Sequence, residues 1–298
     1  MKHLCRAFLF LLCLALTAEA DGQGIIKHNP TINRNAKAGK TEAAKSKTKP
    51  ATARNKQTSA KPTFASEWKS LYYSFVYVRG GTFQMGATPQ MINPFPNELP
   101  VHTVTVDGFQ ISKYEVTQAL WEAVMGSNPS KVKGRNLPVT NVSWTDCQTF
   151  LSRLSELAQA KSGNPGISFR LPTEAEWEFA ARGGNESKGF RYSGGSDIDA
   201  VGWYAGNANR VRPVGQKKPN ELGLYDMTGN VIEWCNDRSH SYSTLPKVNP
   251  KGPDIGNNYM LRGGSIRNKA RECRISMRFI QLFVDESDFM GLRLVMNE

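Results

Sequence analysis

The sequence has few of the residues and motifs that mark common catalytic sites. Of its 298 residues, four are histidine and five are cysteine. His102 and His240 are the only histidines after residue 62. They are too few and too far apart in the chain to indicate an iron or zinc site. The chain also lacks a phosphate-binding loop and a nucleophile elbow. These absences argue against a nucleotide hydrolase, a zinc hydrolase or an α/β-hydrolase.

Acidic residues are scarce at the N-terminal end, and this accounts for most of the net charge of +12. Residues 1–62 contain 12 Lys and Arg against 3 Asp and Glu, whereas the rest contains 26 against 23. Residues 21–67 also have few large apolar side chains, so we expect a basic, disordered linker that acts as a solvated spacer. Contact with anionic envelope polymers is the alternative. Without aromatic residues between the lysines, no specific nucleic-acid binding is expected.

Residues 1–20 have the features of a secretory signal peptide. Lys2 and Arg6 begin a segment that continues with an apolar run at 7–17 and ends in an Ala-x-Ala cleavage pattern at Ala20. The apolar run is short for a bilayer span, which makes a retained anchor the weaker alternative. We therefore expect an exported protein, periplasmic or secreted, with no transmembrane span after signal cleavage.

The remaining chain, 68–298, predicts one α+β domain with few helices and much irregular structure. Ser143 and Asp146 form a capping box ahead of an amphipathic helix that ends near Gly163, and Thr173 begins another helix. Further elements are expected at 117–125 (helix) and at 75–78, 101–114, 230–234, 259–262 and 292–295 (strands).

Four motifs occur in order along this domain: 80–86 (GGTFQMG), 171–184 (LPTEAEWEFAARGG), 223–234 (GLYDMTGNVIEW) and 261–265 (LRGGS). Together they resemble the formylglycine-generating enzyme family, also called sulfatase-modifying factors, over residues 75–295. The resemblance implies a compact single domain with a C-type-lectin-like core and little regular secondary structure.

The resemblance also implies a chemistry that this chain does not fully match. Active members of that family oxidise a sulfatase cysteine to formylglycine with molecular oxygen and a copper(I) ion held by two cysteines. Their first cysteine corresponds to Asn268, three residues after Ser265, and their second to Cys273. A carboxamide is a hard, neutral donor that does not replace a thiolate on copper(I). Ile232 and Phe289 also stand where the family has tryptophan and asparagine. We therefore expect no copper site.

Two functions remain open from the sequence. The first is an exported, non-copper binding or accessory module that recognises an unknown protein or envelope ligand. The alternative is an oxygen-dependent oxidase of the formylglycine-generating type, acting on an exported protein or a small molecule. Asn268 favours the first function. A preserved pocket with Ser265, Cys273 and a bound metal would favour the second.

The same resemblance implies a structural calcium site. Its ligands would be the side chain of Asp226, the carbonyl groups of Gly229 and Val231, and the carboxylate of Glu233. Oxygen donors in a tight, glycine-containing loop suit this hard cation. The alternative is that Asp226 and Glu233 only cap a turn and bind arginine side chains.

Three cysteines remain after the signal peptide. Cys147 lies on the apolar face of its helix, and we expect it to be buried and inert. Cys235 follows the Glu-Trp motif, which in the family packs beside the C-terminal cysteine segment, so a Cys235–Cys273 disulfide is our hypothesis. We also expect the basic C-terminal cluster to form internal ion pairs with nearby acids rather than an anion pocket. The cluster consists of Arg262, Arg267, Lys269, Arg271, Arg274 and Arg278, and the acids are Asp285, Glu286 and Asp288.

Overall fold

The computed structural model describes residues 61–297. The predicted signal peptide and most of the predicted linker lie outside the described residues. The domain boundary expected at residue 68 falls inside the first helix, α1 (Phe64–Tyr72), which begins at a capping box formed by Thr63 and Ser66. Phe64 and Trp68 pack against the main apolar core, so this helix is part of the domain.

The predicted helices and their caps are confirmed. The Ser143 side chain accepts a hydrogen bond from Asp146 N, and the helix ends at Gly163 with a φ of 72°. Thr173 caps the next helix in the same way. Among the described residues, no helix is long and apolar enough to cross a membrane. The other α-helices are α2 (Gln118–Met125), α3 (Trp144–Ser162), α4 (Glu174–Ala181) and α5 (Ile198–Val201), and the 3₁₀ helices are η1 (Pro96–Glu98), η2 (Gly184–Glu186) and η3 (Ala270–Cys273).

The strands of the described part form three sheets, two with four strands and one with three. The first has the order β1 (Phe75–Val78), β4 (Phe109–Ser112), β11 (Val295–Asn297) and β5 (Ser168–Arg170). The second has the order β10 (Met290–Gly291), β6 (Ile232–Arg238), β8 (Asn258–Arg262) and β9 (Arg278–Leu282). The third has the order β2 (Gly81–Met85), β3 (His102–Val106) and β7 (Lys247–Val248).

The strand prediction is correct for β1, β3, β4 and β8 but wrong near the C-terminus, where 292–295 lies mostly between β10 and β11. Strands β2, β5, β7 and β9 were not expected at all. Strands β5 and β7 have only three and two residues, which is too short to show an alternating pattern. Their pairing partners are also distant in sequence, as in the β5–β11 ladder.

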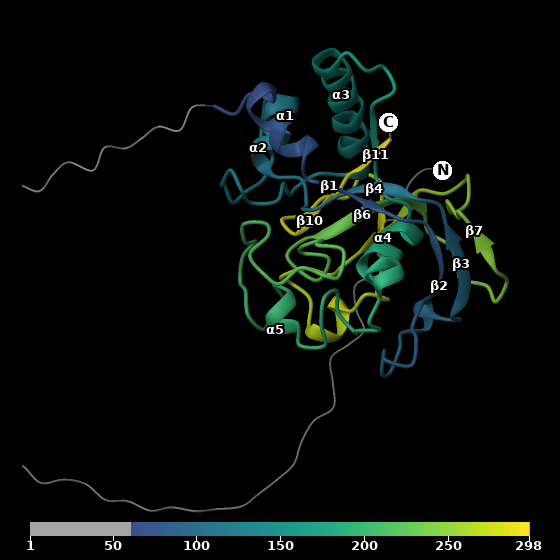
Figure 1. Cartoon of the computed structure of the whole chain (residues 1–298). Helices are drawn as coiled ribbons and strands as arrows, with labels where there is room; N and C mark the ends of the chain where they lie inside the picture. The colour runs from purple at the N-terminus through teal and green to yellow at the C-terminus, as the bar shows by residue number, and fades with distance from the viewer. Residues whose placement is uncertain (1–60, 298) are drawn as a thin grey trace, which may run out of the picture. The chain divides into compact units, whose positions relative to one another are not determined.

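The first sheet lies between α3 and α4 (Figure 1), and its residues contribute to two apolar clusters, one around each helix. Val295 packs into the cluster around α4, and its neighbour Met296 packs into the cluster around α3, as the two-residue period of a strand requires. In the α3 cluster, Trp121 stacks on Phe150 with ring centroids 4.7 Å apart. Helix α4 contacts β2, β3, β6 and β8, so it is enclosed by the second and third sheets.

The enclosed position of α4 explains where the C-terminal arginines find their partners. Arg262 contacts both Glu174 and Glu178 of α4, and Arg278 Nε lies 2.6 Å from Glu174 Oε1. Arg274 pairs with Glu98 of η1. The expectation of internal ion pairs is confirmed, but the expected partners are wrong except for Arg267 with Asp288 at 3.0 Å. The true partners lie more than 80 residues from the arginines in the chain. The sequence of α4 has a glutamate at every second position from 174 to 178, and taken alone such charges are typical of an exposed helix.

Candidate functional site

The loop after β8 brings Ser265, Asn268 and Cys273 together. Gly263 and Gly264 adopt φ values of 96° and 69°, which glycine tolerates at little cost. A Cβ atom on Gly264 would lie 2.7 Å from Cys273 Sγ, so the backbone approaches the thiol closely. Cys273 Sγ lies 3.8 Å from the carbonyl oxygen of Ser265. The residues expected at the family's copper position are therefore neighbours in space.

Hydrogen bonds already engage the side chain of Asn268. Ser265 Oγ donates to Asn268 Oδ1 at 2.8 Å, and Asn268 Nδ2 donates to Glu272 Oε2 at 3.4 Å. The backbone nitrogen of Asn268 donates to Ser265 O at 3.0 Å. The carboxamide thus stabilises the turn between Ser265 and η3, which is a structural role for the residue at this position.

Cys273 is a buried thiol. It is fully buried among Tyr192, Ile198 and Val201. Burial raises the pKa of its thiol to about 12. The hydrogen bond to the Ser265 carbonyl lowers this pKa and the charge of Glu272 raises it, but both effects are smaller than that of burial. At neutral pH the sulfur therefore keeps its proton, whereas a soft-metal ligand or nucleophile needs the thiolate.

The expected Cys235–Cys273 disulfide is absent from the structure, in which Cys147, Cys235 and Cys273 are free and buried. Cys235 lies on β6 and packs into the α4 cluster, whereas Cys273 packs into a separate small cluster beside α5. The two thiols face different apolar environments, and this corrects the proposed pairing. Burial raises the pKa of Cys147 and of Cys235 well above the usual range, so both are unreactive.

The residues expected to bind calcium lie around the turn before β6. Asp226 and Gly229 adopt φ values of 57° and 79° in this turn. Asp226 Oδ2 accepts a hydrogen bond from Gly215 N at 2.6 Å. Its other oxygen, Oδ1, is buried without a hydrogen-bond partner among the described residues. Burial raises the pKa of Asp226 to about 6, so its carboxyl group holds its proton up to a higher pH than an exposed aspartate does.

Two residues that the sequence analysis did not single out complete this acidic centre. Glu115 is buried and accepts from Asn230 Nδ2 at 2.6 Å and from Val231 N at 3.1 Å. Burial and then the charges of Asp226 and Glu233 raise the pKa of Glu115 well above its usual range. Arg293 donates to Glu233 at 2.8 and 3.0 Å, and Trp177 Nε1 donates to the same carboxylate at 2.7 Å.

This centre contains three buried carboxyl groups against a single guanidinium, that of Arg293. An excess of acidic oxygens with one oxygen unpaired suits a hard cation. No group of three or more His, Cys, Asp and Glu side chains in residues 61–297 is arranged to hold a metal ion. Backbone carbonyl groups such as those of Gly229 and Val231 would therefore have to contribute to a calcium site here.

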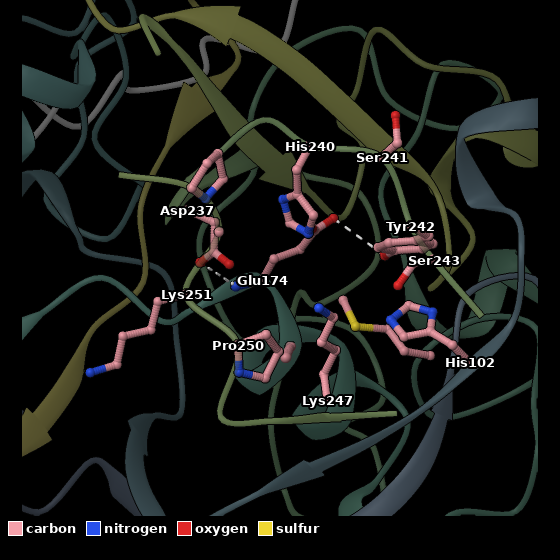
Figure 2. Close-up of a pocket in the computed structure, with 14 residues that line it drawn as sticks. His102, Glu174, Asp237, His240, Ser241, Tyr242, Ser243, Lys247, Pro250 and Lys251 are labelled. Carbon is pink, nitrogen blue, oxygen red and sulfur yellow. Dashed lines mark hydrogen bonds between the residues drawn. The ribbon is translucent and has the colours of Figure 1, made fainter. Parts of the chain in front are cut away.

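A separate cavity of about 400 Å³ opens beside the first residues of α4 (Figure 2). Its lining comes from β2, β3, α4, the end of β6 and the loop that follows β6. The ring of His102 lies 4.6 Å from that of Tyr242, and the ring of His240 lies 6.2 Å from it. The sequence analysis set these two histidines aside as too distant in the chain. The fold brings both to one pocket because β7, within the loop, pairs with β3.

Comparisons with known proteins cover the same part of the chain. The family model described as "Sulfatase-modifying factor enzyme 1-like domain" matches residues 60–298. Chaperone protein LppX of Paenibacillus barcinonensis is 39% identical over 48% of this chain and 67% of its own length. The formylglycine-generating enzyme of Streptomyces coelicolor is 30% identical over 64% of this chain and 77% of its own length.

Solved structures give the same result for the fold. Treponema denticola variable protein 1 superposes with a TM-score of 0.65 and 29% identity, covering 75% of this chain and 95% of that chain. PvdO from Pseudomonas aeruginosa gives a TM-score of 0.63 with 25% identity, covering 75% of this chain and 94% of that chain. The region that the family model matches, 60–298, contains all four sequence motifs, at 80–86, 171–184, 223–234 and 261–265.

Proposed function

Because the chain belongs to the sulfatase-modifying factor enzyme 1-like family, we propose that it is an exported, copper-independent binding or accessory member of that family. The observation that carries this proposal is the hydrogen-bonded carboxamide of Asn268 at the first copper-ligand position. The oxidase function remains the alternative, because formylglycine-generating enzymes are among the relatives.

The residues at the copper position do not fit copper(I). That ion prefers two soft thiolate ligands, and here one is replaced by a neutral amide engaged with Ser265. The other, Cys273, is a buried neutral thiol whose pKa burial raises to about 12. Binding copper here would require ionising a buried thiol without a second sulfur to share the metal charge. No catalytic step through copper is therefore assigned to these residues.

Two further observations support a binding or accessory role. One relative, 39% identical, is named a chaperone protein, and one structural neighbour is named a variable protein, neither of which is a formylglycine-generating enzyme by name.

Export is proposed from residues 1–20, whose basic start, apolar run and Ala-x-Ala pattern are those of a signal peptide. The basic linker would then tether the domain near anionic envelope polymers.

The decisive test supplies copper(I), oxygen and a Cys-x-Pro-x-Arg peptide to the purified full-length protein. We expect no aldehyde on the peptide cysteine by mass spectrometry and no stoichiometric copper(I) binding. The variant Asn268→Cys restores the second sulfur and should gain copper(I) affinity, whereas Asn268→Ser removes the carboxamide without adding sulfur and should not. Aldehyde formation by the unmodified protein would establish the oxidase alternative instead.

We also propose a structural calcium ion at the turn before β6. The side chains of Asp226 and Glu233 and the carbonyl groups of Gly229 and Val231 would hold it, and it would offset the excess negative charge beside Glu115. The unpaired, buried Oδ1 atom of Asp226 supports this assignment. When bound, the ion would fix the turn that connects the acidic centre to β6.

The calcium proposal predicts a thermal shift. Calcium at about 100 times its Kd should stabilise the folded protein by about 2.7 kcal/mol, which is about 5 to 11 °C in melting temperature for a domain of this size. Asp226→Asn should reduce the shift, since the amide oxygen can still accept from Gly215 N but the variant removes one negative charge from the site. Magnesium serves as the comparison ion. Equal melting temperatures in chelator and in calcium would show that no such site exists.

A further inference from the structure

Two lysines, Lys247 and Lys251, line the pocket beside α4. Figure 2 shows Lys247 extending its amino end toward the middle of the pocket, while Lys251 extends away from it. Neither lysine forms an ion pair within the part of the chain that the structure describes. Of the two acids that line the pocket, Glu174 is paired with Arg278 and Arg262, and Asp237 accepts a hydrogen bond from Glu174 N. Lys247 is therefore free to bind an anionic group of a ligand.

The two imidazoles present hydrogen-bond acceptors to the same pocket. His102 Nδ1 lies 3.2 Å from Pro100 O, and His240 Nδ1 lies 3.2 Å from Arg238 O. A carbonyl oxygen only accepts, so each Nδ1 must donate. In the neutral ring this leaves Nε2 as an acceptor. Acceptors of this kind suit hydroxyl groups of a ligand.

Ser243 and Asp237 add two more polar groups to this pocket. Ser243 Oγ is buried without a hydrogen-bond partner among the described residues. Asp237 uses one oxygen to accept from Glu174 N at 2.9 Å. Burial and then the charge of Glu174 raise the pKa of Asp237 well above its usual range. A buried polar atom without a partner is destabilising, and a ligand hydroxyl would satisfy it.

We propose that this pocket binds a small sugar acid: Lys247 pairs with the carboxylate, and His102, His240 and Ser243 bind the hydroxyl groups. The cavity of about 400 Å³ is within the usual range for small-molecule sites of about 300 to 1,000 Å³. One cation next to several hydroxyl partners matches one carboxylate on a polyhydroxylated ring. The inference rests on the proposed binding role of the domain, for which it supplies a ligand class and a location.

The test is isothermal titration of the full-length protein with D-glucuronate, D-glucose and acetate. We expect saturable glucuronate binding with a Kd of about 1 mM or lower. Glucose lacks the carboxylate and acetate lacks the hydroxyl groups, so each should bind at least about tenfold more weakly. Absence of saturable glucuronate binding, or equal affinity for glucose or acetate, would overturn the proposal.

Three variants locate the binding site. Lys247→Gln should weaken glucuronate binding about tenfold or more, since it removes a charge-assisted hydrogen bond. His240→Phe keeps a ring beside Tyr242 but removes Nε2, and it should weaken binding several-fold. Lys251→Gln, the matched control, should bind like the unmodified protein. Unchanged affinity in Lys247→Gln would overturn the proposal. The aldehyde assay is independent of this outcome, so failure of the ligand proposal and failure of the proposed function can be told apart.

Discussion

The Arg262→Met variant is expected to lose about 3 to 5 kcal/mol of unfolding free energy, the usual cost of breaking a buried ion pair. Arg262 is completely buried and is the only guanidinium among the described residues that contacts both Glu174 and Glu178. It also donates to Ser276 O at 3.1 Å and to Ile275 O at 2.9 Å. Methionine matches the unbranched stem of arginine, so the loss reports the missing charge and hydrogen bonds more than a missing volume.

Thermal and urea unfolding of the full-length protein measure this effect. A loss of this size corresponds to a melting temperature lower by about 10 °C for a domain of this length. The matched control is Arg267→Met, which removes the exposed pair with Asp288 and should change stability by at most about 1 kcal/mol. Equal losses in the two variants would mean that the buried network does not stabilise the fold.

The Gly229→Ala variant is expected to be similarly damaging, through backbone geometry alone. At a φ of 79°, a Cβ atom on this residue would lie 2.0 Å from Trp203 O and 2.8 Å from Trp203 C. Both atoms belong to the backbone, and Trp203 O also accepts from Asn230 N at 2.7 Å. Strain of about 1 to 3 kcal/mol and overpacking of about 1 to 3 kcal/mol add to a loss of about 2 to 6 kcal/mol.

Gly126→Ala separates strain from the steric clash. Gly126 ends α2 at a φ of 80°, nearly that of Gly229, but a Cβ atom there would meet nothing within 4 Å. Urea unfolding should therefore show a loss of only about 1 kcal/mol for Gly126→Ala, the cost of a left-handed alanine. If both alanine variants lose the same free energy, the close contact with Trp203 is not present in solution.

Local chemistry made the helices predictable. In the capping boxes at Ser143 and Thr173, both partners of each hydrogen bond lie within the same four residues of the chain. The sequence alone therefore locates these boxes. The predicted linker includes the first four residues of α1, 64–67, and the packing of Phe64 against the core, which joins them to the domain, depends on residues far along the chain. Strand β9 was missed for a related reason, since its pairing with β8 depends on residues about twenty positions away.

The candidate site was predicted only where a motif marks it. The resemblance identified Ser265, Asn268 and Cys273, and in the structure Ser265 contacts both of the other two. Nothing in the sequence indicated that His102 and His240 share a pocket, because their proximity follows from the β3–β7 pairing. The acidic partners of Arg274 and Arg278 were equally hidden, since they depend on how η1 and α4 pack.

The structure of the loop between β6 and β8 affects how this protein can evolve. Its ends and its middle are fixed by backbone contacts: Ser239 N donates to Asn258 O, and Asn249 N donates to Thr105 O. Most side chains from 243 to 248 are exposed, whereas the Arg278–Glu174 pair, one of the ion pairs that stabilise the domain, is buried. Mutations in this one segment can therefore alter the shape and charge of the pocket at little cost in folding. Selection for a new ligand and selection for a stable fold then act on different residues.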